Sequence, residues 1–140
     1  MAINTRAYTT LAYEVGALAD SATTLVPGTA CKITKLPVSP VKTITDNFFS
    51  IAASGAGDQV NGVVSLTGNI TDALSGRMVM MNAAFIPVLL NASLKKGDFL
   101  KPVTGGKWDK ASLLDKAYAE LMEDGAMGAV AWARPIEKIV

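Results

Sequence analysis

Short stretches of alternating polar and apolar residues, separated by turns rich in glycine and proline, run through most of this chain. Residues 32–36 alternate in this way, and Pro37 and Pro40 follow them, which is typical of an edge strand or a connection. Further strand candidates are residues 47–52, 60–66, 77–81, 84–90 and 99–103. Residues 104–107 (TGGK) predict a tight hairpin turn that returns into Trp108. About seven short strands with marked turns predict a mainly β protein, a small β-sandwich or a barrel-like domain.

Residues 111–124 fit two different structures. The apolar residues that recur there at helical spacing are Leu113, Leu114, Ala117, Tyr118, Leu121 and Met122. Ser112 can cap such a helix at its start, and Gly125 can lie just past its end. Local propensity therefore favours one short helix near residues 111–124. In the alternative, residues 116–122 form a strand that turns back and pairs with residues 129–133.

The first 28 residues differ from the rest of the chain, because they are rich in Thr and Ala and end at a Pro-Gly turn. Tyr8, Leu11 and Tyr13 give a loose alternation, while Gly16 weakens any helix. We interpret residues 1–28 as an extended N-terminal arm and the remainder, 29–140, as a single β-rich domain. An ordinary first strand or a short helix packed on the domain is the alternative.

Composition and charge narrow the classes of protein that fit. Half of the 140 residues are hydrophobic and 18% are charged, which indicates one packed domain rather than a disordered chain. The net charge is +1 and the basic residues are scattered, so the electrostatic pattern of a nucleic-acid binder is missing. No run approaches the roughly 20 apolar residues of a membrane helix. We therefore expect neither direct nucleic-acid binding nor membrane insertion.

The residues that usually carry chemistry are scarce. The chain has no histidine, which excludes every catalytic triad or dyad that uses imidazole as its base. Cys31 is the only cysteine, so an intrachain disulfide and a Cys-rich metal site are excluded, and we expect a small buried hydrophobe there. Most carboxylates fall in predicted turns, where Asp serves the backbone geometry. We expect no enzymatic activity, no cofactor and no metal site.

The order of the turn and strand patterns resembles a known family. The matching segments, in chain order, are Gly62-Val63-Val64, residues 77–81, Phe85-Ile86-Pro87-Val88, residues 94–100 (LKKGDFL), Gly105-Gly106-Lys107-Trp108 and residues 123–132 (EDGAMGAVAW). With this order, the chain resembles the small capsid decoration (cement) proteins of tailed bacteriophages. The resemblance covers residues 28–135, and residues 97–106 are its most characteristic part.

This resemblance implies a structural virion protein, made in the host bacterial cytoplasm and bound to the outer surface of the expanded phage head. It implies that the major capsid protein is its partner, that a homotrimer forms, and that binding stabilises the head against internal DNA pressure. The alternative is another structural virion component, such as a head fibre base or a tail protein. A small ligand-binding β-barrel is a further alternative.

Two groups of residues are candidates for contacts in such an assembly. In the N-terminal arm, we expect Tyr8, Leu11 and Tyr13 to contact the capsid or a neighbouring copy. For the trimer interface, we expect the apolar strand and one tryptophan to contribute Phe85, Ile86, Val88, Leu90 and Trp132. Both expectations rest on the pattern of apolar residues alone. Residues 84–90 are apolar on both faces, so this strand is either central in the domain or buried at an interface.

Overall fold

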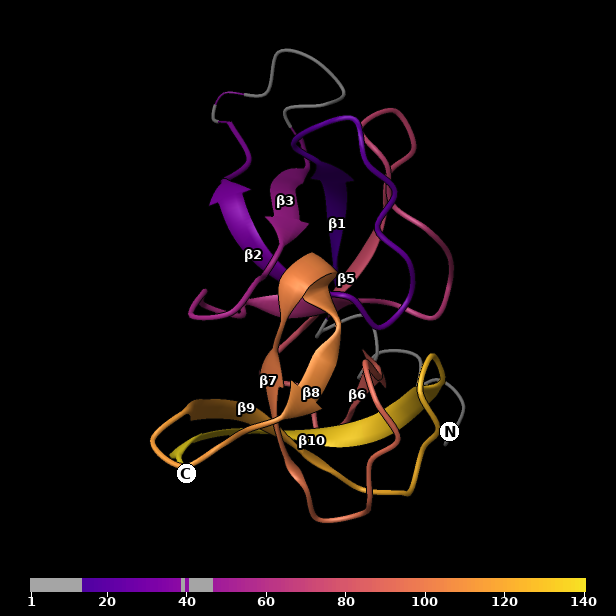
Figure 1. The fold of residues 1–140 in the computed structure, drawn as a ribbon. Coiled ribbons are helices and arrows are strands. Elements are labelled where there is room, and N and C mark those ends of the chain that lie inside the picture. Colours follow the sequence, from indigo (N-terminus) through magenta and orange to yellow (C-terminus); the bar gives the residue numbers. More distant parts are fainter. Residues whose placement is uncertain (1–13, 39, 41–46) are drawn as a thin grey trace, which may run out of the picture.

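A computed structural model of the chain describes residues 14–38, 40 and 47–140. The prediction of a mainly β protein with a barrel is confirmed (Figure 1). The strands are β1 (Glu14–Ala19), β2 (Ala30–Lys35), β3 (Phe49–Ala53), β4 (Gly62–Val64), β5 (Gly76–Met80), β6 (Ile86–Leu89), β7 (Phe99–Pro102), β8 (Trp108–Lys110), β9 (Lys116–Leu121) and β10 (Val130–Ile139). The 3-10 turn η2 (Thr104–Gly106) joins β7 to β8.

The first five strands form a closed barrel in the order β1-β3-β2-β4-β5. Strand β1 runs parallel to β3, whereas the other neighbours in the barrel, including the closing pair β1 and β5, are antiparallel. Closure pairs the backbone groups that an open sheet would leave free at its edges. This barrel is the indigo-to-magenta half of Figure 1.

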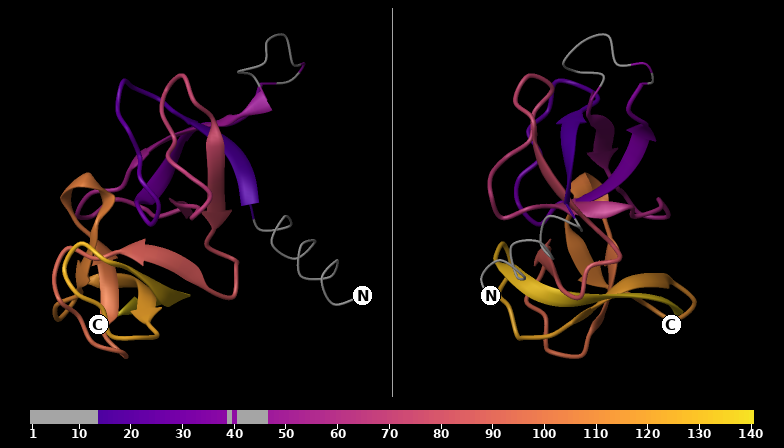
Figure 2. Two further views of the ribbon diagram at one scale, coloured as in Figure 1. Left: turned by 90° about the vertical axis from the view of Figure 1, so that its right-hand side faces the viewer. Right: turned by 180° about the vertical axis from the view of Figure 1, so that it is seen from behind.

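The last five strands form a second, antiparallel sheet in the order β6-β10-β9-β7-β8. Its two edge strands approach each other where Leu90 bridges to Trp108, and the backbone N–H of Asn91 donates to the carbonyl of Trp108 at 2.8 Å. The β7–β8 hairpin extends from this sheet to the barrel, where η2 packs on β3 (Figures 1 and 2). The two sheets therefore pack as one body.

A shared core holds the two sheets together. Trp108 is fully buried in a cluster built from the second sheet, and Ala30 and Val63 from the barrel belong to the same cluster. The indole N–H of Trp108 donates to the carbonyl of Gly28 at 3.1 Å. Gly28 has a φ of +85°, and a Cβ at this position would lie 2.7 Å from the backbone nitrogen of Leu89, so only glycine fits. Trp108 thus joins the barrel to the second sheet.

The helix that local propensity favours near residues 111–124 is absent; a tight turn and strand β9 occupy this segment. In β9, Ala117, Ala119 and Leu121 are buried and alternate with more exposed residues, which is the period of a strand. Pairing with β7 on one side and β10 on the other satisfies its backbone and outweighs the helical propensity. The alternative of a strand at 116–122 is correct, but its predicted partner is not: β9 pairs with residues 133–139 of β10, and residues 130–133 pair with β6.

The expected arm also differs from the structure where it can be compared. From Glu14 onward the chain is part of the barrel, because β1 pairs with both β3 and β5. Leu25 is almost fully buried and bridges to Ile70. The segment 14–28 is therefore a structural part of the barrel, while residues 1–13 lie outside the described part of the chain.

Candidate binding surface

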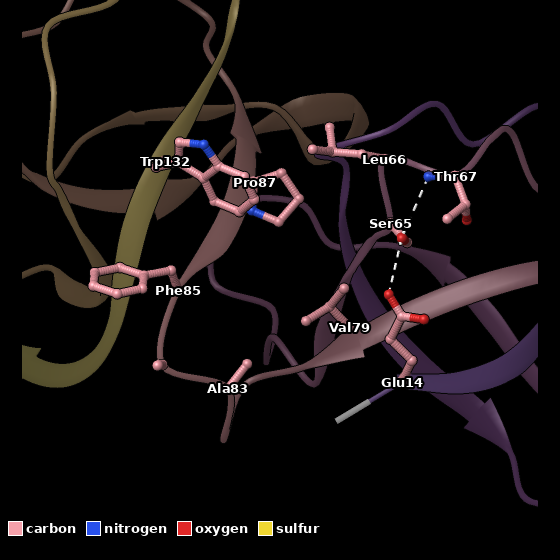
Figure 3. Close-up of a pocket in the computed structure, with 10 residues that line it drawn as sticks. Glu14, Ser65, Leu66, Thr67, Val79, Ala83, Phe85, Pro87 and Trp132 are labelled. Atoms are coloured by element: carbon pink, nitrogen blue, oxygen red, sulfur yellow. Dashed lines mark hydrogen bonds between the residues drawn. The ribbon is translucent and has the colours of Figure 1, made fainter. Parts of the chain in front are cut away.

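An apolar groove of about 410 Å³ lies between the barrel and the second sheet. Its lining residues, most of them apolar, are Glu14, Ser65, Leu66, Thr67, Val79, Ala83, Ala84, Phe85, Pro87 and Trp132 (Figure 3). Both halves of the molecule contribute, since Glu14 and Val79 belong to β1 and β5, and Pro87 and Trp132 belong to β6 and β10. We call this feature the apolar groove.

Aromatic side chains form one wall of the apolar groove. Trp132 lies directly opposite Pro87 in the β10–β6 ladder, and Figure 3 shows Phe85 beside them. The alternation of β10 buries Ala131 and Ala133 and turns Trp132 outward, where 46% of it is exposed. Phe85 is 52% exposed. Large aromatic surfaces held on paired strands are typical anchors of protein interfaces.

The other wall combines apolar side chains with a polar rim. Leu66 is 53% exposed on this side. The hydroxyl of Ser65 donates to Glu14 Oε1 at 3.1 Å, and Arg77 Nε lies 3.7 Å from Glu14 Oε2 (Figure 3). The backbone N–H of Thr67 donates to Ser65 Oγ at 3.4 Å. Because the Glu14 carboxylate is already engaged, the groove is suited to burying apolar groups rather than to acid–base chemistry.

The structure divides the five residues predicted for a trimer interface into two groups. Ile86, Val88 and Leu90 are fully buried in the core of the protein itself, so they cannot contact a neighbouring chain and this part of the prediction is wrong. Phe85 and Trp132 are exposed and line the apolar groove. The candidates in the N-terminal arm, Tyr8, Leu11 and Tyr13, lie outside the described residues.

A second apolar surface, which sequence reasoning missed, lies at the turn between β8 and β9. Leu113 and Leu114 are 80% and 78% exposed, and we call this pair the leucine tip. Leu114 has a φ of +72°, in the left-handed region that costs a side chain such as leucine about 1 kcal/mol or more. An exposed apolar side chain held at such a cost marks a candidate contact site.

Hydrogen bonds from several neighbouring residues hold the turn that carries the leucine tip. The carboxylate of Asp115 accepts hydrogen bonds from the backbone N–H of Ser112 at 2.8 Å and from Lys101 Nζ at 2.7 Å. The backbone N–H of Leu114 donates to the carbonyl of Val140 at 2.7 Å. The hydrogen bond from Lys101, together with that from Ser112, lowers the pKa of Asp115 below its ordinary value. The Ser112-x-x-Asp115 pattern is the sequence signal that predicts such a turn.

The remaining candidates for chemistry are structural. Cys31 is fully buried, its thiol donates to the carbonyl of Thr29 at 3.4 Å, and burial raises its pKa to about 12, as expected for a small core residue. In the described ranges, no three His, Cys, Asp or Glu side chains gather closely enough to hold a metal ion. Among residues 14–38, 40 and 47–140 there is no helix with the length and apolar character needed to cross a bilayer.

Comparison of the sequence with family models and with curated proteins finds no match. Comparison of the structure with solved structures finds the N base of the head fiber gp8.5 of bacteriophage phi29. The TM-score is 0.69, the likeness covers 91% of this chain and 96% of that chain, and 12% of the residues are identical. At that identity the likeness establishes the fold: nearly the whole of this chain folds as the phage head fiber base does.

Proposed function

We propose that this chain is a structural protein of a tailed-phage virion that binds the outer surface of the expanded head. The observation that carries the proposal is the likeness of fold to a phage head fiber base over nearly the full length of both chains. The order of turn and strand motifs, which resembles that of capsid decoration proteins, points to the same class of protein.

The exposed surfaces of the molecule suit a binding role without catalysis. The leucine tip and the apolar groove present large apolar side chains on a braced backbone. Burying one leucine fully contributes about 1.5–3 kcal/mol, so a single such contact is weak. Several weak contacts made at once on a repetitive shell give tight binding through avidity.

Two finer roles are compatible with this proposal. In the first, the protein is a decoration (cement) protein that binds the major capsid protein, forms a homotrimer and stabilises the head. In the second, it is the base of a head fibre, which the name of the similar structure favours. The roles differ in occupancy, since a decoration protein covers equivalent positions across the lattice and a fibre base occupies a limited set.

The experiment that tests the proposal is a pelleting assay of the purified protein with undecorated, expanded heads of its phage. Saturable binding at a fixed ratio to the capsid subunit is the expected result. The double variant Leu113→Ser/Leu114→Ser removes the leucine tip and is expected to bind more weakly. Leu74→Ser is the matched control, because Leu74 is 60% exposed but belongs to neither apolar surface. Failure of the folded, unmodified protein to pellet with the heads contradicts the proposal.

The same preparations separate the two finer roles. Electron microscopy of saturated heads is expected to show density at every equivalent lattice position for a decoration protein. Density at a restricted set of positions assigns the fibre-base role instead. Heating the heads with and without bound protein tests cementing, because a cement protein raises the temperature at which the shell opens.

A further inference from the structure

The apolar groove and the leucine tip lie near opposite ends of one strand. Strand β10 lines the groove with Trp132 and ends at Ile139, which pairs with Lys116 just after the tip. At about 3.3 Å per residue, Trp132 and Ile139 are roughly 23 Å apart along this strand. In Figure 1, β6 and the chain end marked C accordingly lie toward opposite ends of β10. The tip therefore cannot reach the groove of its own molecule.

The groove has the size and the chemistry to take the two leucines of the tip. It measures about 410 Å³, whereas the space that one leucine side chain fills in a protein core is on the order of 150 Å³. Its wall of Trp132, Phe85 and Pro87 is apolar, as aliphatic side chains require (Figure 3). Among the described residues that line it, Glu14 is the only charged one, and its carboxylate already accepts from Ser65. Burial of the leucines there therefore separates no free charge from water.

The tip is equally prepared for burial. The backbone N–H of Leu114 donates to the carbonyl of Val140 at 2.7 Å, and the carboxylate of Asp115 is paired with Lys101 at 2.7 Å. The charges nearest to both surfaces are thus paired within their own chain, so bringing the surfaces together leaves none of them without a partner. A turn that is already held by hydrogen bonds also loses little freedom on binding.

We propose that the leucine tip of one copy of this chain docks in the apolar groove of a second copy. Leu113 and Leu114 then contact Phe85 and Trp132, and both apolar surfaces leave water. A second copy is the matching occupant, because every copy that carries a groove also carries a tip. The two surfaces differ, so the contact is head-to-tail and repeats from copy to copy. It forms between copies alone and stands apart from the proposed virion function.

Crosslinking between two single-cysteine variants tests this contact. Cys31 is buried and its pKa is raised to about 12, so a short bismaleimide reacts with the introduced cysteines alone. Leu113→Cys places a thiol at the tip and keeps Leu114. Ala84→Cys places a thiol at an exposed residue of the groove and keeps its aromatic wall. An equal mixture of the two variants is expected to give covalent dimers, and either variant alone is expected to give none.

Two controls accompany this pair. Leu74→Cys mixed with Ala84→Cys is expected to give no dimers, since Leu74 is 60% exposed but belongs to neither surface. Leu113→Cys/Leu114→Ser mixed with Ala84→Cys is expected to give about tenfold less dimer, because one of the two buried leucines is lost. The mixtures are compared at about 1 mM, since the burial of two leucines supports a dissociation constant on that order. Circular dichroism checks that each variant is folded.

Three results overturn the inference. Dimers from Ala84→Cys alone in the same yield as from the mixture mean that two grooves face each other. Dimers from Leu113→Cys alone in that yield mean that two tips meet. Absence of dimers from the mixture of folded variants means that the tip does not enter the groove. Pelleting with phage heads is a separate measurement, so the virion proposal fails or succeeds independently.

Discussion

The barrel and the second sheet differ in what they enclose and in what they expose. The core of the second sheet contains a fully buried aromatic residue, Trp108, whereas the largest fully buried side chains of the barrel core are Ile51, Ile70 and Met78. The exposed leucines of the barrel half lie in loops, but β10 of the second sheet carries exposed apolar residues along a paired strand, at Val130, Trp132 and Ile139. A contact surface on a paired strand keeps its shape when it binds. We therefore expect contacts with a partner to fall mainly on the second sheet, while the barrel contributes Leu66 and Val79 to the apolar groove.

The largest loss of stability is expected from a substitution where the barrel and the second sheet join. Trp108→Ala removes the largest buried side chain and its hydrogen bond to Gly28, and should lower the free energy of unfolding by about 3–5 kcal/mol. Trp132→Ala, at the exposed tryptophan, should cost about 1 kcal/mol or less. Urea denaturation of the two variants measures both values. Equal losses would remove the distinction between Trp108, which joins the two halves, and Trp132, which lines the groove.

A second test addresses how the β7–β8 hairpin packs on the barrel. Gly105 and Gly106 both have a positive φ, of +79° and +77°, so alanine at either position costs about 1–2 kcal/mol in backbone strain. A Cβ on Gly106 would also lie 2.7 Å from the carbonyl oxygen of Ala30, while a Cβ on Gly105 meets nothing within 4 Å. Gly106→Ala should therefore lower the melting temperature clearly more than Gly105→Ala. Equal melting temperatures would mean that the hairpin can move away from the barrel at little cost.

The leucine tip offers a test in which stability and binding change in opposite directions. Leu114→Gly relieves the left-handed strain but adds the chain entropy of glycine, so it should raise the free energy of unfolding by about 0.5–1 kcal/mol. If the tip contacts the phage head, the same variant should pellet less with heads. Denaturation and the pelleting assay together check both signs. If the variant is more stable but binds the heads as before, the left-handed backbone of Leu114 is a property of the turn and has no role in binding.

The smallest effect concerns the carboxylate that braces the leucine tip. The pKa of Asp115 is lowered from its ordinary value of 3.8 in the folded protein, so the ionised carboxylate stabilises the fold above pH 3.8. This stabilisation is lost as the pH falls through the lower pKa of the folded state. Asp115→Asn should therefore melt slightly lower than the unmodified protein at pH 7, and this difference should shrink as the pH falls below 3.8. Melting curves across this range measure the difference. A difference that stays constant down to pH 3 would exclude the ionised carboxylate as its source.

Patterns within short stretches of the sequence were sufficient to predict many of the strands. Alternation and glycine turns predicted strands close to β2 and β5, and the TGGK segment predicted the β7–β8 hairpin, because these patterns act over a few residues. A first strand packed on the domain was only the alternative to an extended arm, since the parallel pairing of β1 joins Ala17 to Phe49 and leaves no local trace. The helix expected at 111–124 failed for a related reason, because pairing with distant strands decides that segment.

The contact surfaces were harder to predict than the strands. An apolar run such as residues 84–90 gives the same pattern whether it is buried within one chain or between chains, so Ile86 and Phe85 could not be separated by sequence. Leu113 and Leu114 are among the apolar residues that recur at helical spacing in 111–124, but the turn makes them the most exposed large apolar residues described. The apolar groove joins residues from β1, β5, β6 and β10, which only the folded structure brings together.

The hydrogen bonds at Val140 have a practical consequence for how this protein can be engineered. Its carbonyl accepts from Leu114, and its N–H donates to the carbonyl of Asp115 at 2.9 Å, so this residue is fixed beside the leucine tip. Anything fused after Val140, such as an affinity tag or a displayed domain, therefore emerges next to that tip. A bulky fusion there would compete with whatever the tip contacts, and a long flexible linker is the sensible choice for cargo that must not interfere.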